Sequence, residues 1–182
     1  MDVRDIGLTA TFASLYAILV VVLAPISYGP IQLRIADCLI PLSALFGWPV
    51  VVGVTIGCVV GNAYYSPGLY AFLGPIAFLD IFLGPVANFI AASLIFALRR
   101  HRLLACVVGA LPIGFIVGGY LWLFFPPPEV LEFLPMWIGM IISITISSLI
   151  AIAVIGYGLL VALSKPNIIE PLKSRGLKVV SS

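Results

Sequence analysis

The sequence predicts an all-α, polytopic membrane protein, folded as a six-transmembrane-helix bundle. Its composition is the first observation, because only 9 % of the 182 residues are charged and 63 % are apolar. A soluble domain carries about a quarter charged residues. The mean hydropathy of +1.26 is the second observation. The third is that the apolar residues form long runs, as spans of about 20 residues require. We expect residues 1–182 to form a single membrane domain.

The breaks between the apolar runs define the spans. Pro25 ends the first run, and we expect that run to be a retained helix because no small-residue cleavage site follows it. Gly47-Trp48-Pro49 divides the run 38–65, which as one helix would overshoot a core of about 30 Å. Ser66-Pro67-Gly68 is expected to be a connection. The expected spans are about 6–25, 38–47, 49–65, 75–98, 103–125 and 135–163, with 26–37 as a loop. A five-span alternative keeps 38–65 as one helix, and helix length favours six.

The basic residues predict the orientation. Residues 99–102 and the tail beyond residue 163 are basic, whereas the loop 126–133 carries Glu129 and Glu132 and no base. With six spans, both basic segments and the N-terminus fall on one side. The positive-inside rule makes that side cytoplasmic, so both termini are expected in the cytoplasm. Arg34 then lies on the outer side, against the rule.

Polar residues within the spans are the candidates for function. Asp80 is the clearest, since an ionisable group inside a span costs roughly 2.5–3.5 kcal/mol on insertion scales. The alternative for Asp80 is a hydrated position near the outer interface. Asn62 and Asn88 suit ligand binding and helix–helix hydrogen bonding equally well.

Residues 28–37 carry the strongest local pattern, Tyr-Gly-Pro-Ile-Gln-Leu-Arg-Ile-Ala-Asp. Gln32, Arg34 and Asp37 alternate with apolar residues, and this period of two predicts an extended segment with one polar face. Such a segment lying over a bundle suits a gate. The alternative is an interfacial loop in which Arg34 extends its charge to water.

Small residues recur at helical spacing on two spans. One stripe is Ala10, Ala13 and Ala17, and the other is Gly53, Gly57 and Gly61. Small residues four apart let a second helix approach closely. The partner is either another helix of this chain or another subunit.

Motifs for chemistry are absent from the sequence. It has no Gly-rich phosphate loop, no His-Glu-x-x-His run and no Gly-x-Ser-x-Gly elbow. His101 lies among arginines, and the three cysteines are unpaired in spacing and suit packing. We therefore expect no catalytic residue, no metal site and no cofactor of the chain's own. Aromatic residues such as Tyr64 and Trp122 near the expected outer ends suit an interface belt or stacking on a planar ligand.

The segment 26–37 resembles the QueT family, the substrate-capture subunits (S-components) of energy-coupling-factor (ECF) transporters for queuosine precursors. The family pattern is close to Ser-x-Gly-Pro-Ile-Gln-x-Arg, followed by a small residue and Glu; Asp37 stands here in place of that Glu. Gly61-Asn62, Leu79-Asp80, Gly84 and Ala91-Ala92 are also similar to the family. The resemblance covers nearly the whole chain.

The resemblance implies a ligand pocket near the outer face, covered by the loop 26–37. The implied ligand is a 7-deazaguanine, such as 7-cyano- or 7-aminomethyl-7-deazaguanine, or queuine. The implied partners of the chain are a membrane coupling subunit, docked on Ala10, Ala13 and Ala17, and two cytoplasmic ATPases that use ATP. No nucleic acid is expected as a partner. The alternatives are another vitamin-like ligand on the same scaffold, or a self-contained carrier or channel.

Roles for the site residues follow from the shape of a guanine-like edge. We expect Asp80 to accept its adjacent N–H donors, Asn62 and Gln32 to pair with the carbonyl and remaining edge, and Tyr64 or Trp122 to stack. Arg34 is expected to anchor the loop to Asp37. An analogue lacking a donor would leave buried protein groups unpaired, so such a site discriminates strongly.

Overall fold

The regular secondary structure of the chain is helical. The computed structural model describes residues 2–27, 33–73, 78–174, 176 and 178–180, and within these ranges there is no strand, which confirms the all-α prediction. The helices are α1 (Val3–Val22), α2 (Ala24–Ser27), the 3₁₀-helix η1 (Ile35–Leu42), α3 (Ser43–Phe46), α4 (Trp48–Leu73), α5 (Phe78–Ala97), α6 (Arg102–Leu121), the 3₁₀-helix η3 (Glu129–Leu131), α7 (Met136–Ser148), the π-helix η4 (Leu149–Gly156), α8 (Tyr157–Leu163) and α9 (Pro166–Ser174).

Apolar helical stretches occupy each of the six predicted spans. Within the described residues, four of them are long and apolar enough to cross a membrane: Val3–Val22, Phe78–Ala97, Arg102–Leu121 and Met136–Leu163. Two shorter apolar stretches are Ile35–Phe46 and Trp48–Tyr64. The two are separated at Gly47, whose φ of 68° lies in the left-handed region that favours glycine. Residues 38–65 therefore do not form one continuous helix.

The expected connection at Ser66-Pro67-Gly68 was wrong, because α4 continues as a helix to Leu73. Proline removes only one intrahelical donor, and its φ is compatible with a helix.

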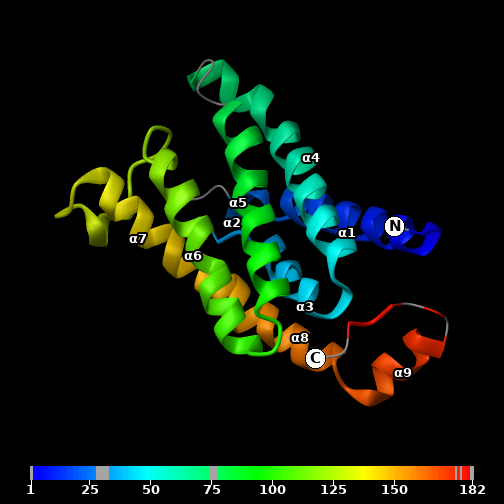
Figure 1. Ribbon diagram of the computed structural model, residues 1–182. Coiled ribbons are helices and arrows are strands. Elements are labelled where there is room, and N and C mark those ends of the chain that lie inside the picture. Colours follow the sequence, from blue (N-terminus) through cyan, green and yellow to red (C-terminus); the bar gives the residue numbers. More distant parts are fainter. Residues whose placement is uncertain (1, 28–32, 74–77, 175, 177, 181–182) are drawn as a thin grey trace.

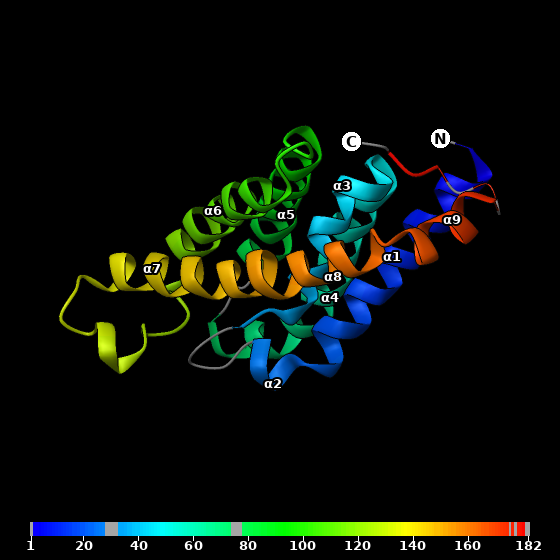
Figure 2. The same ribbon diagram turned by 90° about the horizontal axis from the view of Figure 1, so that it is seen from below.

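The helices α1, α4, α5, α6 and α7 pack mainly against their neighbours in that order, as Figures 1 and 2 show. The ridge of Gly53, Gly57 and Gly61 brings α4 against α1. A Cβ atom on Gly57 would lie 2.6 Å from the carbonyl oxygen of Ala13 and 2.7 Å from the Cβ atom of Tyr16. This glycine ridge is therefore an internal packing surface.

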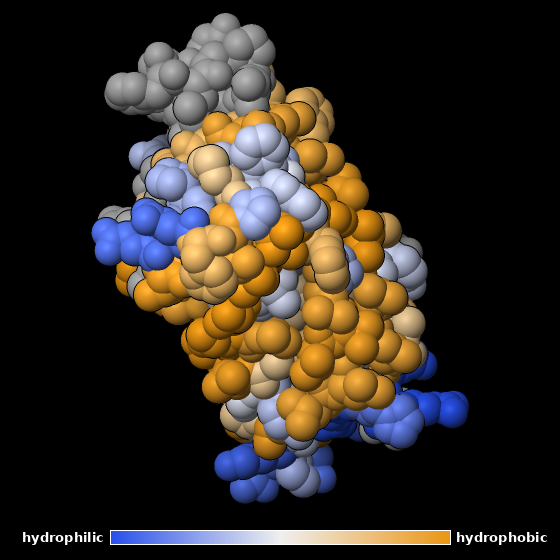
Figure 3. Space-filling view, turned by 90° about the vertical axis from the view of Figure 1, so that its left-hand side faces the viewer, coloured by the Kyte–Doolittle hydropathy of each residue, from blue (hydrophilic) through white to orange (hydrophobic). Residues whose placement is uncertain are grey.

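The outside of the bundle is apolar. Exposed large side chains such as Ile18, Phe82, Phe115 and Val154 lie on four different helical segments. On the face in Figure 3, apolar surface forms a broad band, and hydrophilic residues gather below it and at its upper left. A surface of this kind matches the hydrocarbon core of a bilayer.

The two ends of the chain meet at one end of the bundle. Lys178 Nζ lies 2.9 Å from Asp2 Oδ2 in an ion pair, and Arg4 donates to the carbonyl of Gly176 at 2.9 Å. The connection between α5 and α6 reaches the same end, because Arg102 donates to Ser164 Oγ at 2.9 Å just after α8. We call this end the terminal face.

Candidate functional site

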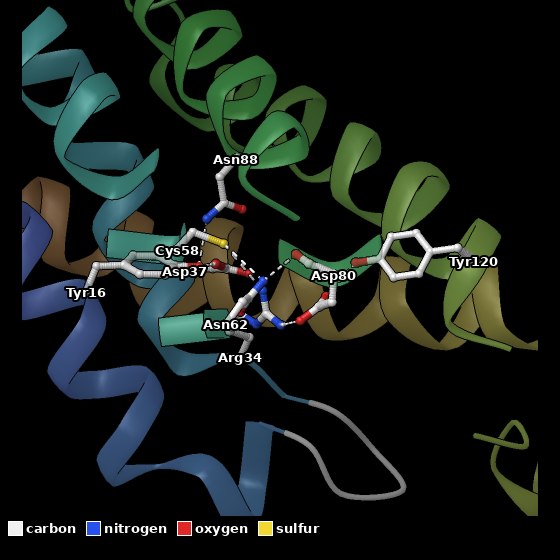
Figure 4. Close-up of polar contacts among 8 residues, drawn as sticks. All are labelled: Tyr16, Arg34, Asp37, Cys58, Asn62, Asp80, Asn88 and Tyr120. Carbon is white, nitrogen blue, oxygen red and sulfur yellow. Dashed lines mark hydrogen bonds and ion pairs between the residues drawn. The ribbon is translucent and has the colours of Figure 1, made fainter. Parts of the chain in front are cut away.

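A cluster of polar side chains is buried where α1, η1, α4, α5 and α6 meet (Figure 4). Arg34 and Asp37 come from the segment just before and at the start of η1, and the other members come from largely apolar helices. We call the cluster the buried polar network, and its residues are Tyr16, Arg34, Asp37, Cys58, Asn62, Asp80, Asn88 and Tyr120.

Asp80 and Arg34 form the ionic half of the buried polar network. Arg34 Nη2 lies 3.7 Å from Asp80 Oδ2, and the two side chains are only 13 % and 7 % exposed. Tyr120 from α6 donates its hydroxyl hydrogen to Asp80 Oδ1 at 2.5 Å. Both carboxylate oxygens of Asp80 thus face a donor or a positive charge, which buried carboxylates require.

Asp37 is at the centre of the other half. Tyr16 from α1 donates to Asp37 Oδ1 at 2.5 Å. Asn88 from α5 donates to the hydroxyl oxygen of Tyr16 at 2.7 Å. The tyrosine hydroxyl therefore both donates and accepts, and it links α1 to η1 and to α5.

Asn62 connects the network to the backbone of α5. Its side-chain amide donates to the carbonyl oxygen of Asp80 at 2.7 Å. Gly84 makes room for this contact, because a Cβ atom there would lie 2.7 Å from Asn62 Nδ2. Cys58, one turn before Asn62, accepts long contacts from Asn62 at 3.6 Å and from Arg34 at 3.7 Å.

The extended conformation predicted through Asp37 was wrong at its end. Ile35–Leu42 is a 3₁₀-helix, and Asp37 N–H donates to the carbonyl of Arg34 at 3.0 Å. In a 3₁₀-helix, residues three apart eclipse one another. Arg34, at the N-cap of η1, and Asp37 are three residues apart, so the 3₁₀ turn brings them to the same side, where the sequence prediction had used an extended segment to do so.

A small cavity adjoins Arg34 and Asp37. Its other lining residues come from α6 and α7: Ile113, Val117, Ile144, Ser147 and Ser148. The volume open to the centre of a water molecule is about 20 Å³. This is room for about one water molecule. The cavity is therefore too small for a heterocyclic base in this conformation.

The sequence prediction selected part of this site. Arg34, Asp37, Asn62 and Asp80 are brought together, and Asn88, left open between binding and packing, joins them. Arg34 forms its ion pair with Asp80, a contact that the sequence interpretation did not include. Gln32 lies outside the described residues.

Two predicted stacking residues are placed differently. Tyr64 is 67 % exposed on α4. Trp122 is half-buried, and its indole N–H donates to the carbonyl of Gly119 at 2.9 Å. Neither belongs to the buried polar network of Figure 4.

The proposed docking stripe on α1 divides into two parts. Ala10 is exposed, whereas Ala13 and Ala17 are half-buried. Ala13 contacts the glycine ridge of α4. Only part of the stripe is thus open to a further helix.

Sequence reasoning missed Tyr16, Tyr120, Ser147 and Ser148. The two tyrosines interrupt apolar runs on α1 and α6, and buried tyrosine hydroxyls usually have a hydrogen-bond partner. The two serines lie side by side at the end of α7, directly before the π-helix η4.

Comparisons with known proteins identify relatives of this chain. The sequence model of a family described as "QueT transporter" matches residues 6–165. The curated "Queuosine precursor transporter QueT" of Lactococcus lactis subsp. cremoris (strain MG1363) is 43 % identical over 60 residues. That match covers 32 % of this chain and 35 % of the relative. No solved structure matches the chain.

Proposed function

Because the chain belongs to the QueT transporter family, whose model covers residues 6–165, we propose that it is the substrate-binding membrane subunit of an ECF-type importer for queuosine precursors. The family is one of transporters and not of enzymes. The curated relative is named for a queuosine precursor, which supports a 7-deazaguanine as the ligand.

The proposed topology has six spans with both termini in the cytoplasm, all within one membrane domain over residues 1–182. The meeting of the chain ends and the basic connection 99–102 at the terminal face supports this orientation. Apart from Arg34, the basic residues of the sequence fall at Arg4, in 99–102 and in 165–178. Positive charge of this distribution favours the cytoplasmic side.

The buried polar network is the observation that carries the proposed ligand. A deazaguanine presents adjacent N–H donors and a carbonyl on one planar edge. Asp80 and Asp37 offer acceptors, Asn62 offers an amide that both donates and accepts, and Arg34 offers donors for the carbonyl. In our proposal Asp80 binds the donor edge, and Asp37, on the wall of the cavity, provides the second carboxylate.

Binding requires the site to open, since about 20 Å³ admits about one water molecule. The segment 26–37 is the proposed gate, because it ends in Arg34 and Asp37. Gln32 in this segment is proposed to contact the ligand. Ser147 and Ser148 are added to the proposed site as hydroxyl donors from the opposite wall of the cavity.

The proposed partners are a membrane coupling subunit and two cytoplasmic ATPases. No cofactor belongs to this chain in the proposal, and ATP is used by the partners. The exposed Ala10 with its neighbours Ala13 and Ala17 is the proposed docking stripe on α1, since small side chains allow close helix approach.

Calorimetric titration of the detergent-purified protein tests the ligand. The titrants are 7-cyano-7-deazaguanine, 7-aminomethyl-7-deazaguanine, queuine and guanine. We expect a deazaguanine to bind tightly and guanine much more weakly. No heat with any of the four, from protein whose helical circular dichroism is intact, would contradict the ligand assignment.

Matched variants assign the site. Asp37→Asn and Ser147→Ala change the cavity wall, and Tyr64→Phe changes an exposed side chain outside the network. We expect the first two to weaken deazaguanine binding and Tyr64→Phe to leave it unchanged, because phenylalanine keeps the aromatic ring that would stack. Unchanged affinity in Asp37→Asn would remove the second carboxylate from the site.

Copurification tests the transport machinery. We expect the chain, expressed with ECF coupling and ATPase subunits, to be retained with them on an affinity column, and Ala10→Trp to abolish that retention. Uptake of a deazaguanine by the chain alone in liposomes would instead support a self-contained carrier.

A further inference from the structure

A second cavity lies at the terminal face and shares no lining residue with the buried polar network. Its lining residues are Leu45, Arg102, Ser164, Ile169, Lys173, Val179 and Val180. The volume open to the centre of a water molecule is about 190 Å³ in this cavity. This holds several water molecules or a group as large as a phosphate.

Two cations from different elements line this cavity. Arg102 begins α6, and Lys173 lies in the last turn of α9. Arg102 Nη1 donates to Ser164 Oγ at 2.9 Å, and Ser164 in turn donates to the carbonyl of Leu160 at 2.6 Å. The serine thus holds the guanidinium in place by accepting one of its five N–H donors.

Neither cation is paired with a carboxylate within the described part of the chain. The ion pairs formed there are Arg34–Asp80, Lys178–Asp2 and Lys178–Asp5. Arg102 and Lys173 therefore carry positive charge beside a cavity, and neither forms an ion pair with a carboxylate among the described residues. A fork of guanidinium donors and an ammonium group together suit a phosphate.

The remaining wall is apolar, and part of it comes from the C-terminal segment. Leu45, Ile169, Val179 and Val180 contribute it, and Val180 N–H donates to the carbonyl of Leu45 at 2.7 Å. Free inorganic phosphate has no apolar atoms to contact an apolar wall, whereas a phospholipid has apolar atoms next to its phosphate.

We propose that this cavity binds a phosphate group carried by an anionic membrane lipid, held between Arg102 and Lys173. The bound phosphate joins the start of α6 to α9 and so fastens the C-terminal segment to the bundle. Basic pockets at the cytoplasmic ends of membrane helices bind anionic headgroups in this way. The proposal is independent of the ligand bound by the buried polar network.

The test is the thermal unfolding of delipidated protein in detergent. The additives are phosphatidylglycerol, phosphatidylcholine and inorganic phosphate, each measured separately. We expect phosphatidylglycerol to raise the unfolding temperature and phosphatidylcholine to leave it unchanged. A rise with inorganic phosphate of the same size would support the phosphate site and assign it to a soluble ligand.

Three variants separate a site from general attraction of charge. Arg102→Gln and Lys173→Gln each remove one lining cation, and Arg100→Gln removes an exposed arginine two residues away that does not line the cavity. We expect about fivefold weaker phosphatidylglycerol binding in the first two and unchanged binding in Arg100→Gln. Lys173 is exposed, so its variant keeps the test valid if Arg102→Gln folds poorly. An equal loss of phosphatidylglycerol binding in all three variants would overturn the proposal. So would an unfolding temperature that rises with neither phosphatidylglycerol nor inorganic phosphate.

Discussion

The chain contains two clusters of the same composition, each with two carboxyl groups and one cation, in opposite surroundings. Asp37, Asp80 and Arg34 are buried within the bundle, while Asp2, Asp5 and Lys178 join the chain ends at the terminal face. The exposed pair is the closer one, since Lys178 lies 2.9 Å from Asp2 and Arg34 lies 3.7 Å from Asp80.

The distances between the charges therefore do not decide which cluster contributes more to stability, whereas burial does. The Lys178 side chain is 70 % exposed and that of Asp2 47 %, whereas those of Arg34 and Asp80 are 13 % and 7 % exposed. Water and salt screen the exposed cluster, and pairs of this kind contribute little to stability. Removing one partner of a buried pair leaves a desolvated charge behind. The comparison predicts that equivalent substitutions have very different consequences.

The largest expected effect on stability is that of Asp80→Asn. The change keeps the size of the side chain and leaves Tyr120 a carbonyl oxygen to donate to, but it removes the buried ion pair between Arg34 and Asp80. We expect the free energy of unfolding to fall by about 3–5 kcal/mol. Unfolding in mixed detergent with rising dodecyl sulfate, followed by circular dichroism, measures this.

Lys178→Gln is the matched control at the exposed cluster. We expect it to leave the unfolding transition where it is, because Lys178 is mostly in water. Equal shifts in Asp80→Asn and Lys178→Gln would contradict the ranking by burial.

Tyr16→Phe is expected to have the next largest effect. It removes the hydroxyl that donates to Asp37 and accepts from Asn88, so one buried acceptor and one buried donor lose a partner. The expected loss of stability is about 1–3 kcal/mol.

Tyr120→Phe should cost less stability than Tyr16→Phe, because Asp80 keeps its ion pair with Arg34. The same unfolding assay compares the two, and a larger loss for Tyr120→Phe would mean that the Arg34–Asp80 pair does not compensate.

The excess of carboxyl over guanidinium groups in the buried polar network predicts a ligand preference. A cationic ligand would balance the second carboxylate, so 7-aminomethyl-7-deazaguanine should bind more tightly than the uncharged 7-cyano compound. We expect about tenfold, or about 1.4 kcal/mol. Competition binding measures the ratio, and Asp37→Asn should reduce it toward one. A preference for the cyano compound would indicate that the ligand does not reach the unbalanced carboxylate.

The sequence located the apolar helical stretches because helix length and bilayer thickness are linked by simple geometry, and Gly47 divides 38–65 as expected, while the count of six spans stays a prediction. It also selected Arg34, Asn62 and Asp80, since polar groups at depth are costly without a role. It failed on α4 beyond residue 65 because proline removes only one intrahelical donor and its φ is compatible with a helix, so Pro67 does not by itself end one.

The partners within the network lay beyond sequence reasoning. Tyr16 meets Asp37 across 21 residues and Asn88 across 72, and Tyr120 meets Asp80 across 40. No local periodicity encodes such pairs. Tyrosine and serine are also ordinary members of apolar helices, so Tyr120 and Ser147 carried no signal of their own until the packing brought them to charged groups.

The smallest expected effect concerns the pH range of the exposed cluster. The hydrogen bond from Lys178 lowers the pKa of Asp2 from 3.8 to about 2, and the same contact raises the pKa of Lys178 above 10.5. A lowered carboxyl pKa stabilises the folded contact above pH 3.8, and this contribution is lost as the pH falls from 3.8 through about 2. A raised ammonium pKa stabilises it below pH 10.5, and that contribution is lost as the pH rises through the folded pKa.

The contact between the chain ends should therefore hold between about pH 4 and pH 10 and weaken on either side. Carbon-detected NMR of ¹³C-labelled aspartate measures the Asp2 carboxyl titration directly, with Lys178→Gln as the control. The variant should return the Asp2 midpoint toward 3.8, because the largest cause of the shift is then gone. A midpoint that stays near 2 in Lys178→Gln would assign the shift to the second cause, the backbone N–H of Asp5 at the start of α1, and would mean that the exposed cluster does not tie the chain ends together.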